Sequence, residues 1–133
     1  MQPTLQNYLT MSYAKIIGRN KEINILDRIY KSKKSELVAI YGRRRVGKSY
    51  LVSECFGKKI LFKAVGTYIK DGDKDYESYR QLQLAHFYDS LVIAGLSTKE
   101  SKPTCWREAF LLLRKVLEGK RNRRKIIFID ELP

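Results

Sequence analysis

Short apolar runs alternate with longer amphipathic stretches along this chain. The apolar runs occupy residues 37–41, 60–65 and 126–129, and each is flanked by charged residues or by glycine. Runs of this length are typical of strands that are buried on both faces of a parallel sheet. The stretches between them repeat their apolar residues at the spacing of a helix. The pattern therefore predicts an α/β fold with a parallel sheet.

Four segments are predicted to be helical. They begin near residues 20, 50, 79 and 104 and end near residues 31, 56, 94 and 118. Asn20 and Thr104 are expected to be the N-caps of the first and last helices. Gly57, Gly95 and Gly119 are expected to end the second, third and fourth helices, because glycine tolerates the backbone conformation that follows a helix. Residues 1–14 show no periodicity and are interpreted as a tail, so the predicted domain covers residues 15–133.

Residues 42–49 read Gly-Arg-Arg-Arg-Val-Gly-Lys-Ser and match the pattern G-x-x-x-x-G-K-[ST] of a Walker A loop. An apolar run precedes the loop and a predicted helix follows it, which is the context that phosphate binding requires. The glycines let successive N–H groups turn inward, and the helix N-terminus favours an anion. The lysine supplies a positive charge to the β- and γ-phosphates, and the serine hydroxyl is a hard oxygen ligand for Mg²⁺.

The residues expected to bind nucleotide are Gly42, Arg43, Arg44, Arg45, Val46, Gly47, Lys48, Ser49 and Tyr50. Lys48 is also expected to act on the phosphates during catalysis. The role of the three arginines stays open, because they could strengthen phosphate binding, face a partner or point into solvent.

The third apolar run ends in two acids, Asp130 and Glu131, and so resembles a Walker B strand. With Ser49, Asp130 is expected to hold Mg²⁺, through a coordinated water or through the serine hydroxyl. Glu131 is expected to orient and polarise the attacking water. Because catalysis of phosphoryl transfer consists mostly of positioning and charge stabilisation, this second acid separates hydrolysis from mere binding.

Charge and composition narrow the possible partners. The net charge is +13, and residues 1–66 hold 14 Lys and Arg against 4 Asp and Glu. Such a balance favours anionic partners, which are nucleotide, nucleic acid or anionic lipid, and it does not choose among them. A protein partner also stays open. No apolar run is long enough to span a membrane, and no signal peptide is recognised, so a cytoplasmic location is expected. Cys55, Cys105 and His86 are interpreted as structural residues.

The motifs together resemble the archaeal-type ATPases of prokaryotes, a branch of the AAA+ and STAND class of P-loop proteins. The matching segments are residues 17–22, 41–49 and 128–133. The resemblance implies a three-layer P-loop sandwich, ATP rather than GTP as the nucleotide, and Mg²⁺ as the metal. It also implies that Gly18 and Arg19 lie near the adenine.

Length is the main departure from that family, whose members continue well past the acidic strand. The resemblance therefore implies that this chain is the N-terminal part of an AAA+ core, truncated after the Walker B motif. It also implies that residues 37–41 lack both neighbouring strands. The chain alone is then expected to fold poorly and to have little ATPase activity.

Three functions remain open from the sequence: a Mg²⁺-dependent ATPase, a nucleotide-gated switch or scaffold that does not hydrolyse ATP, and a DNA-associated module. The oligomeric state is left open.

Overall fold

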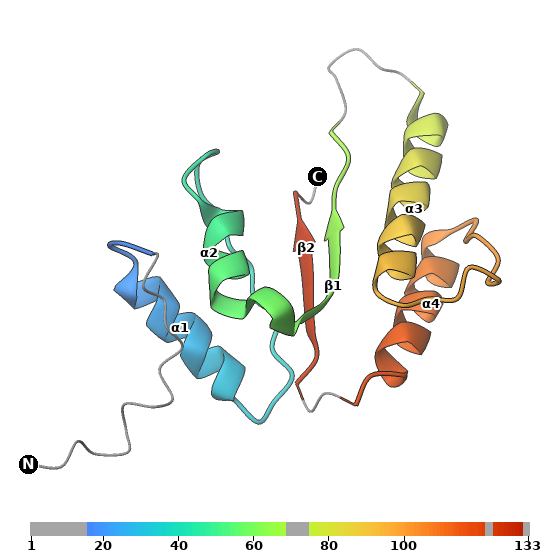
Figure 1. Cartoon of the computed structure of the whole chain (residues 1–133). Helices are drawn as coiled ribbons and strands as arrows, with labels where there is room; N and C mark the ends of the chain where they lie inside the picture. The colour runs from blue at the N-terminus through green and yellow to red at the C-terminus, as the bar shows by residue number, and fades with distance from the viewer. Residues whose placement is uncertain (1–15, 69–74, 122–123, 132–133) are drawn as a thin grey trace, which may run out of the picture. The chain divides into compact units, whose positions relative to one another are not determined.

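The computed structural model describes residues 16–68, 75–121 and 124–131, and the chain divides into two compact units, residues 1–57 and 58–133 (Figure 1). The predicted tail, residues 1–14, lies outside the described residues.

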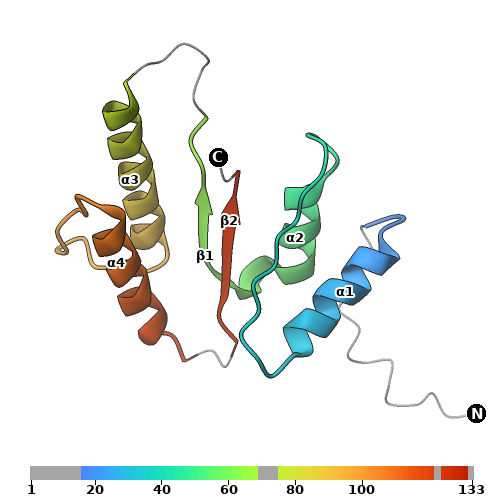
Figure 2. The same ribbon diagram turned by 180° about the vertical axis from the view of Figure 1, so that it is seen from behind.

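The first unit consists of two helices that pack side by side, α1 (Asn20–Lys31) and α2 (Lys48–Phe56), as Figures 1 and 2 show. Their buried residues recur at helical spacing, so each helix turns one apolar stripe toward the other. The contact consists of Ile23, Leu26, Leu51 and Cys55, with Ile16 and Phe56 partly buried around them. Burial, followed by the nearby acids Glu54 and Asp27, raises the pKa of the Cys55 thiol.

The start of α1 differs from the prediction by one residue. Arg19, not Asn20, is the N-cap, and no side chain caps the helix. The Arg19 carbonyl already accepts the Ile23 N–H at 3.0 Å, so Asn20 is inside the helix and its amide cannot serve as the cap. At the other end of the unit Gly57, with φ 40°, ends α2 as predicted.

The prediction of a buried strand at residues 37–41 is wrong. The segment belongs to no strand, and the side chains of Leu37 and Tyr41 are 100% and 93% exposed. The described residues form a single two-stranded sheet, and this segment is not part of it. A strand exists only when a neighbour completes its hydrogen-bond ladder, and apolar side chains alone do not provide one.

The second unit contains the sheet. Its strands are β1 (Ile60–Val65) and β2 (Ile126–Asp130), and they pair in parallel with Val65 beside Asp130. The parallel pairing confirms the predicted α/β fold class. Two helices, α3 (Tyr76–Ile93) and α4 (Trp106–Glu118), lie together against one face of this sheet (Figures 1 and 2).

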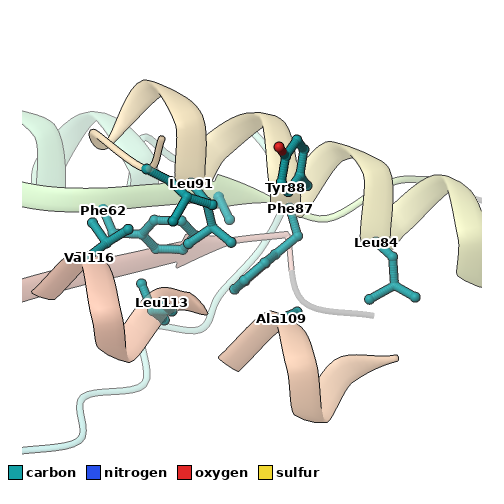
Figure 3. Packing of buried hydrophobic residues seen from close by; sticks show 10 residues of the cluster. Phe62, Leu84, Phe87, Tyr88, Leu91, Ala109, Leu113 and Val116 are labelled. Carbon is teal, nitrogen blue, oxygen red and sulfur yellow. The ribbon is translucent and has the colours of Figure 1, made fainter. Parts of the chain in front are cut away.

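Aromatic and aliphatic side chains from both helices and from β1 form the core of the second unit (Figure 3). Phe87 of α3 lies at its centre, with ring centroids 5.0 Å from Phe62 and 5.5 Å from Trp106. Edge-to-face and tilted ring pairs at these distances stabilise a core beyond their buried area. This packing holds α3 along β1, and it therefore places α3 beside the residues at the C-terminal end of the strand.

Both helices of the second unit begin differently from the prediction. α3 starts about three residues early because the Asp75 carboxylate accepts the Ser78 N–H at 3.1 Å and caps the helix. The N-cap of α4 is Cys105, one residue after the expected Thr104. Thr104 instead donates its N–H and its hydroxyl to the Glu108 carboxylate, at 2.7 and 3.0 Å.

Candidate nucleotide site

The backbone of the predicted phosphate loop has the conformations that its glycines permit. Gly47 has φ 80° and is the N-cap of α2, and Gly42 has φ 152°. A Cβ on Gly47 would meet no atom within 4 Å, so it is the dihedral angle, and not lack of space, that favours glycine there. Arg45 also has a positive φ, 59°, which is uncommon outside glycine. Three residues of the loop thus have positive φ, and such mixtures of backbone conformations can turn successive N–H groups inward.

Helix α2 presents its first turn at the end of this loop. Its first intrahelical hydrogen bond runs from the Leu51 N–H to the Gly47 carbonyl at 2.9 Å. The N–H groups of Lys48, Ser49 and Tyr50 precede that bond, so helix geometry leaves them without an intrahelical acceptor. Leu51 anchors the turn against α1 because its side chain is buried in the contact between the two helices. A fixed helix N-terminus of this kind favours an anion.

Lys48 lies folded over its own loop. Its ammonium donates to the carbonyl oxygens of Gly42 and Arg43, at 2.9 and 2.7 Å. These two bonds hold the charge of Lys48 against the backbone at the start of the loop. A phosphate that enters the loop would offer stronger, charged acceptors in their place.

Arg19 is held against the same loop from outside. Its guanidinium donates to the carbonyl oxygen of Val46, although the two residues are 27 positions apart. The resemblance implied a place near the adenine for this residue, and the structure adds a direct contact with the phosphate loop. The sequence signal was the Gly18-Arg19 pair ahead of α1, but nothing in it indicated the loop carbonyl as the partner.

The two acids stand at the C-terminal end of β2 in the second unit. The Asp130 carbonyl accepts the Gly66 N–H at 2.8 Å, and its carboxylate accepts the Glu131 N–H at 3.1 Å. Glu131 follows with φ 55°, a conformation that is uncommon for a residue with a side chain. The strand end is thus tied to its neighbour while the Glu131 side chain stays exposed.

Gly66 is a site residue that none of the sequence motifs contains. An ideal Cβ on Gly66 would lie 1.9 Å from the Glu131 carbonyl oxygen, which no side chain could tolerate. The end of β1 therefore touches the backbone of the acidic pair. Its signal in the sequence was a single glycine directly after the apolar run 60–65, a position where close backbone approach is common.

The loop and the acids belong to different units, so the structure describes each half of the predicted site by itself. The pairing of Ser49 with Asp130 around a metal remains a prediction. In the described part of the chain, no three His, Cys, Asp or Glu side chains come together as a metal cluster. In phosphoryl-transfer sites Mg²⁺ takes one or two protein oxygens and completes its shell with phosphates and waters. Ser49 and Asp130 supply oxygens of the required kind.

An α/β fold with a parallel sheet, together with a Gly-x-x-x-x-Gly-Lys-Ser loop at a helix N-terminus, defines the class of P-loop nucleotide-binding domains. The chain belongs to a family of ATPase domains found predominantly in Archaea, whose sequence profile matches residues 16–133.

It is also similar to a protein of Methanocaldococcus jannaschii that is described as an uncharacterized ATP-binding protein. The two are 35% identical over 48 residues, which cover 36% of this chain and 81% of that protein. No solved structure matches the chain. Among the residues that the structure describes, every helix is too short or too polar to cross a membrane.

Proposed function

We propose that this chain binds ATP in the loop Gly42–Ser49 and takes part in its Mg²⁺-dependent hydrolysis. The observation that carries the proposal is the loop itself, in which two glycines have positive φ, α2 begins at the end of the loop, and the Lys48 ammonium donates to the Gly42 and Arg43 carbonyl oxygens. Membership of an ATPase domain family and the similarity to a protein described as ATP-binding support ATP as the nucleotide.

The proposed binding step uses residues of the first unit. The N–H groups at the start of α2 donate to phosphate oxygens, and Lys48 exchanges its two loop carbonyls for the β- and γ-phosphates. Arg19 stays on the Val46 carbonyl and keeps the loop from unfolding around the ligand. Ser49 and Asp130 are the residues that would hold Mg²⁺, which stabilises the charge that develops on the phosphate oxygens.

The proposed chemical step adds Glu131 of the second unit. Its carboxylate accepts a hydrogen bond from the attacking water and polarises it, in the role of a water-positioning residue. The φ of 55° sets the direction in which the side chain leaves the strand end. The backbone of Gly66 packs against Glu131 and holds this conformation.

A nucleotide-gated switch that binds ATP without hydrolysing it is the second candidate. It is favoured by the division of the site, because the binding residues share one unit whereas hydrolysis needs Glu131 from the other. The two candidates differ in turnover and agree in binding, so phosphate release separates them.

The proposal extends to the class of P-loop proteins in which the chain is placed. Residues 17–22, 41–49 and 128–133 support a place in the AAA+ and STAND class of P-loop proteins. A P-loop domain over residues 15–133 and a cytoplasmic location are proposed with it.

Titration with a fluorescent ATP analogue tests the binding step. Lys48→Ala should weaken binding at least about tenfold, which corresponds to roughly 1.4 kcal/mol, because the phosphates lose their ammonium partner. Lys21→Ala, which removes an exposed charge from α1 of the same unit, is the matched control and should leave the affinity within about twofold. Equal affinities for Lys48→Ala and the parent would refute the loop assignment.

A further inference from the structure

Three polar side chains of α3 form a chain of contacts that leads to the end of β1. Tyr79, Gln83 and His86 lie on one helix face, at the spacing i, i+4 and i+7. The Tyr79 hydroxyl donates to the Thr67 carbonyl oxygen and accepts from Gln83 Nε2 at 2.7 Å. His86 Nδ1 lies 2.9 Å from the Thr67 hydroxyl. The helix therefore holds Thr67 by both its backbone and its side chain.

Thr67 is joined to the acidic pair by a single residue. Gly66, next to it in the chain, donates its N–H to the Asp130 carbonyl at 2.8 Å. An ideal Cβ on Gly66 would lie 1.9 Å from the Glu131 carbonyl oxygen, so no free space separates the two backbones. Packed groups without space between them transmit a displacement instead of absorbing it. A shift of Thr67 would therefore act on the backbone of Glu131 through Gly66.

Glu131 depends on such support. Its φ of 55° is sparsely populated for a residue with a side chain, and such conformations persist only where the surroundings over-determine them. The Asp130 carboxylate bonds the Glu131 N–H at 3.1 Å on one side. On the other side the contact is the Gly66 backbone, which α3 holds through Thr67.

We propose that Thr67, Tyr79 and His86 are positioning residues that set the direction of the Glu131 carboxylate for its action on water. This inference rests on the proposed hydrolytic function. The apolar core already fixes α3 to the sheet through Phe87 and Leu91. His86 is exposed and adds little to that core, so its contact with Thr67 serves the strand end.

Two tyrosines of α3 give a matched test. Tyr79 and Tyr88 each donate a hydroxyl to a backbone carbonyl 12 residues away, Tyr88 to that of Glu100 at 2.9 Å. Tyr79→Phe and Tyr88→Phe therefore remove the same kind of bond from one helix. In amide NMR spectra, Tyr79→Phe should shift the Glu131 resonance and Tyr88→Phe should leave it in place.

The same pair is compared for turnover in a form of the protein that hydrolyses ATP. Tyr79→Phe should lower phosphate release at saturating ATP about tenfold and leave the ATP affinity within about twofold, because the misplaced group acts only on the attacking water. Tyr88→Phe should change neither quantity by more than about twofold. A stability role alone would affect both variants alike.

Thr67 provides a rescue experiment. Thr67→Val keeps the shape of the side chain but removes the hydroxyl that faces His86, whereas Thr67→Ser keeps the hydroxyl. Thr67→Val should shift the Glu131 resonance, and Thr67→Ser should restore it. If the two tyrosine variants move this resonance equally or not at all, or if Thr67→Ser fails like Thr67→Val, the positioning role is refuted. If no form of the protein that binds ATP releases phosphate, the hydrolytic proposal is refuted instead, and the resonances still decide the positioning of Glu131.

Discussion

Two apolar runs of similar length adopt different structures in this chain. Residues 60–65 form β1 and pair with β2, whereas residues 37–41 form no strand and expose Leu37 and Tyr41 to solvent. Both runs contain β-branched and aromatic residues, which strands prefer. The two runs differ in whether a neighbouring strand is available to pair with them. β1 has a parallel neighbour in its own unit, and the described residues give the other run no place in a sheet.

The two halves of the proposed site, the phosphate loop and the acidic pair, differ in the same way in their dependence on a paired strand. The phosphate loop gets its form from local dihedral angles and from one helix contact, so it is built without a paired strand before it. The acidic pair gets its form from β1, which approaches Glu131 through Gly66. Binding therefore depends on the loop and on contacts within the first unit, and the proposed chemistry depends on strand pairing in the second.

Glu131→Gln separates binding from chemistry and should have the largest effect. The neutral amide fits the same space but polarises water poorly, so phosphate release should fall by about 10²–10⁴-fold, the usual contribution of a proton-accepting group. The ATP affinity should stay within about twofold, because the binding residues lie in the other unit. Phosphate release is measured in a form of the protein that hydrolyses ATP. Unchanged release would remove Glu131 from the catalytic role.

Amide hydrogen exchange compares the two apolar runs directly. The bonded amides of β1 should exchange at least about a hundredfold more slowly than those of residues 37–41, since paired strands open only with their whole unit. Among the described residues, no backbone hydrogen bond involves residues 37–41. Protection of that segment as strong as that of β1 would show that it finds a strand partner in solution.

Gly66→Ala should damage the second unit and spare the first. The added Cβ would lie 1.9 Å from the Glu131 carbonyl oxygen, so the backbone must shift, at a cost of about 1–3 kcal/mol. Gly119→Ala is the matched control, because its Cβ would lie 3.5 Å from the nearest atom, the Val116 carbonyl oxygen. Chemical denaturation gives both stabilities. Equal effects of the two substitutions would contradict the close approach of Gly66 to Glu131.

The regular elements of the second unit were predictable from the sequence because local pattern and tertiary structure agree there. The limits of β1 and the positions of Gly95 and Gly119 follow from apolar spacing and from glycine at helix ends. The run at 37–41 shows where this reasoning stops. Apolar side chains predict burial, but pairing depends on a neighbour that the local sequence does not specify.

The loop was predictable as a motif, whereas its surroundings were not. The pattern of glycines, lysine and serine has few other uses, so eight residues were enough to predict phosphate binding. The contact of Arg19 with Val46 and the contacts of α3 with Thr67 join residues far apart in the chain. Such contacts arise from the packing of whole helices, and no spacing rule in the sequence contains them.

Acid should weaken the second unit through carboxylates at its helix starts, and this is the smallest effect expected. Hydrogen bonds from Arg80 and Gln81 lower the pKa of Glu77 to about 2, and bonds from Ser78 and Thr104 lower the pKa of Asp75 and of Glu108. A folded-state pKa below the unfolded value, which is about 4, means that ionisation stabilises the fold above that pH. The stabilisation is lost as the pH falls from about 4 through the folded values.

Glu77→Gln tests this pH dependence, because the stabilities of the variant and the parent should become equal at low pH. At pH 7 the variant lacks the ionised group that Arg80 and Gln81 bind, so its α3 should unfold slightly more easily than that of the parent. The gap should be small, because Glu77 is exposed and solvent screens its ion pair. Below about pH 2 the parent glutamate is protonated in both states, and the two unfolding curves, followed by circular dichroism, should coincide. A gap of constant size from pH 7 to pH 2 would mean that Glu77 acts through its hydrogen-bonding shape and not through its charge.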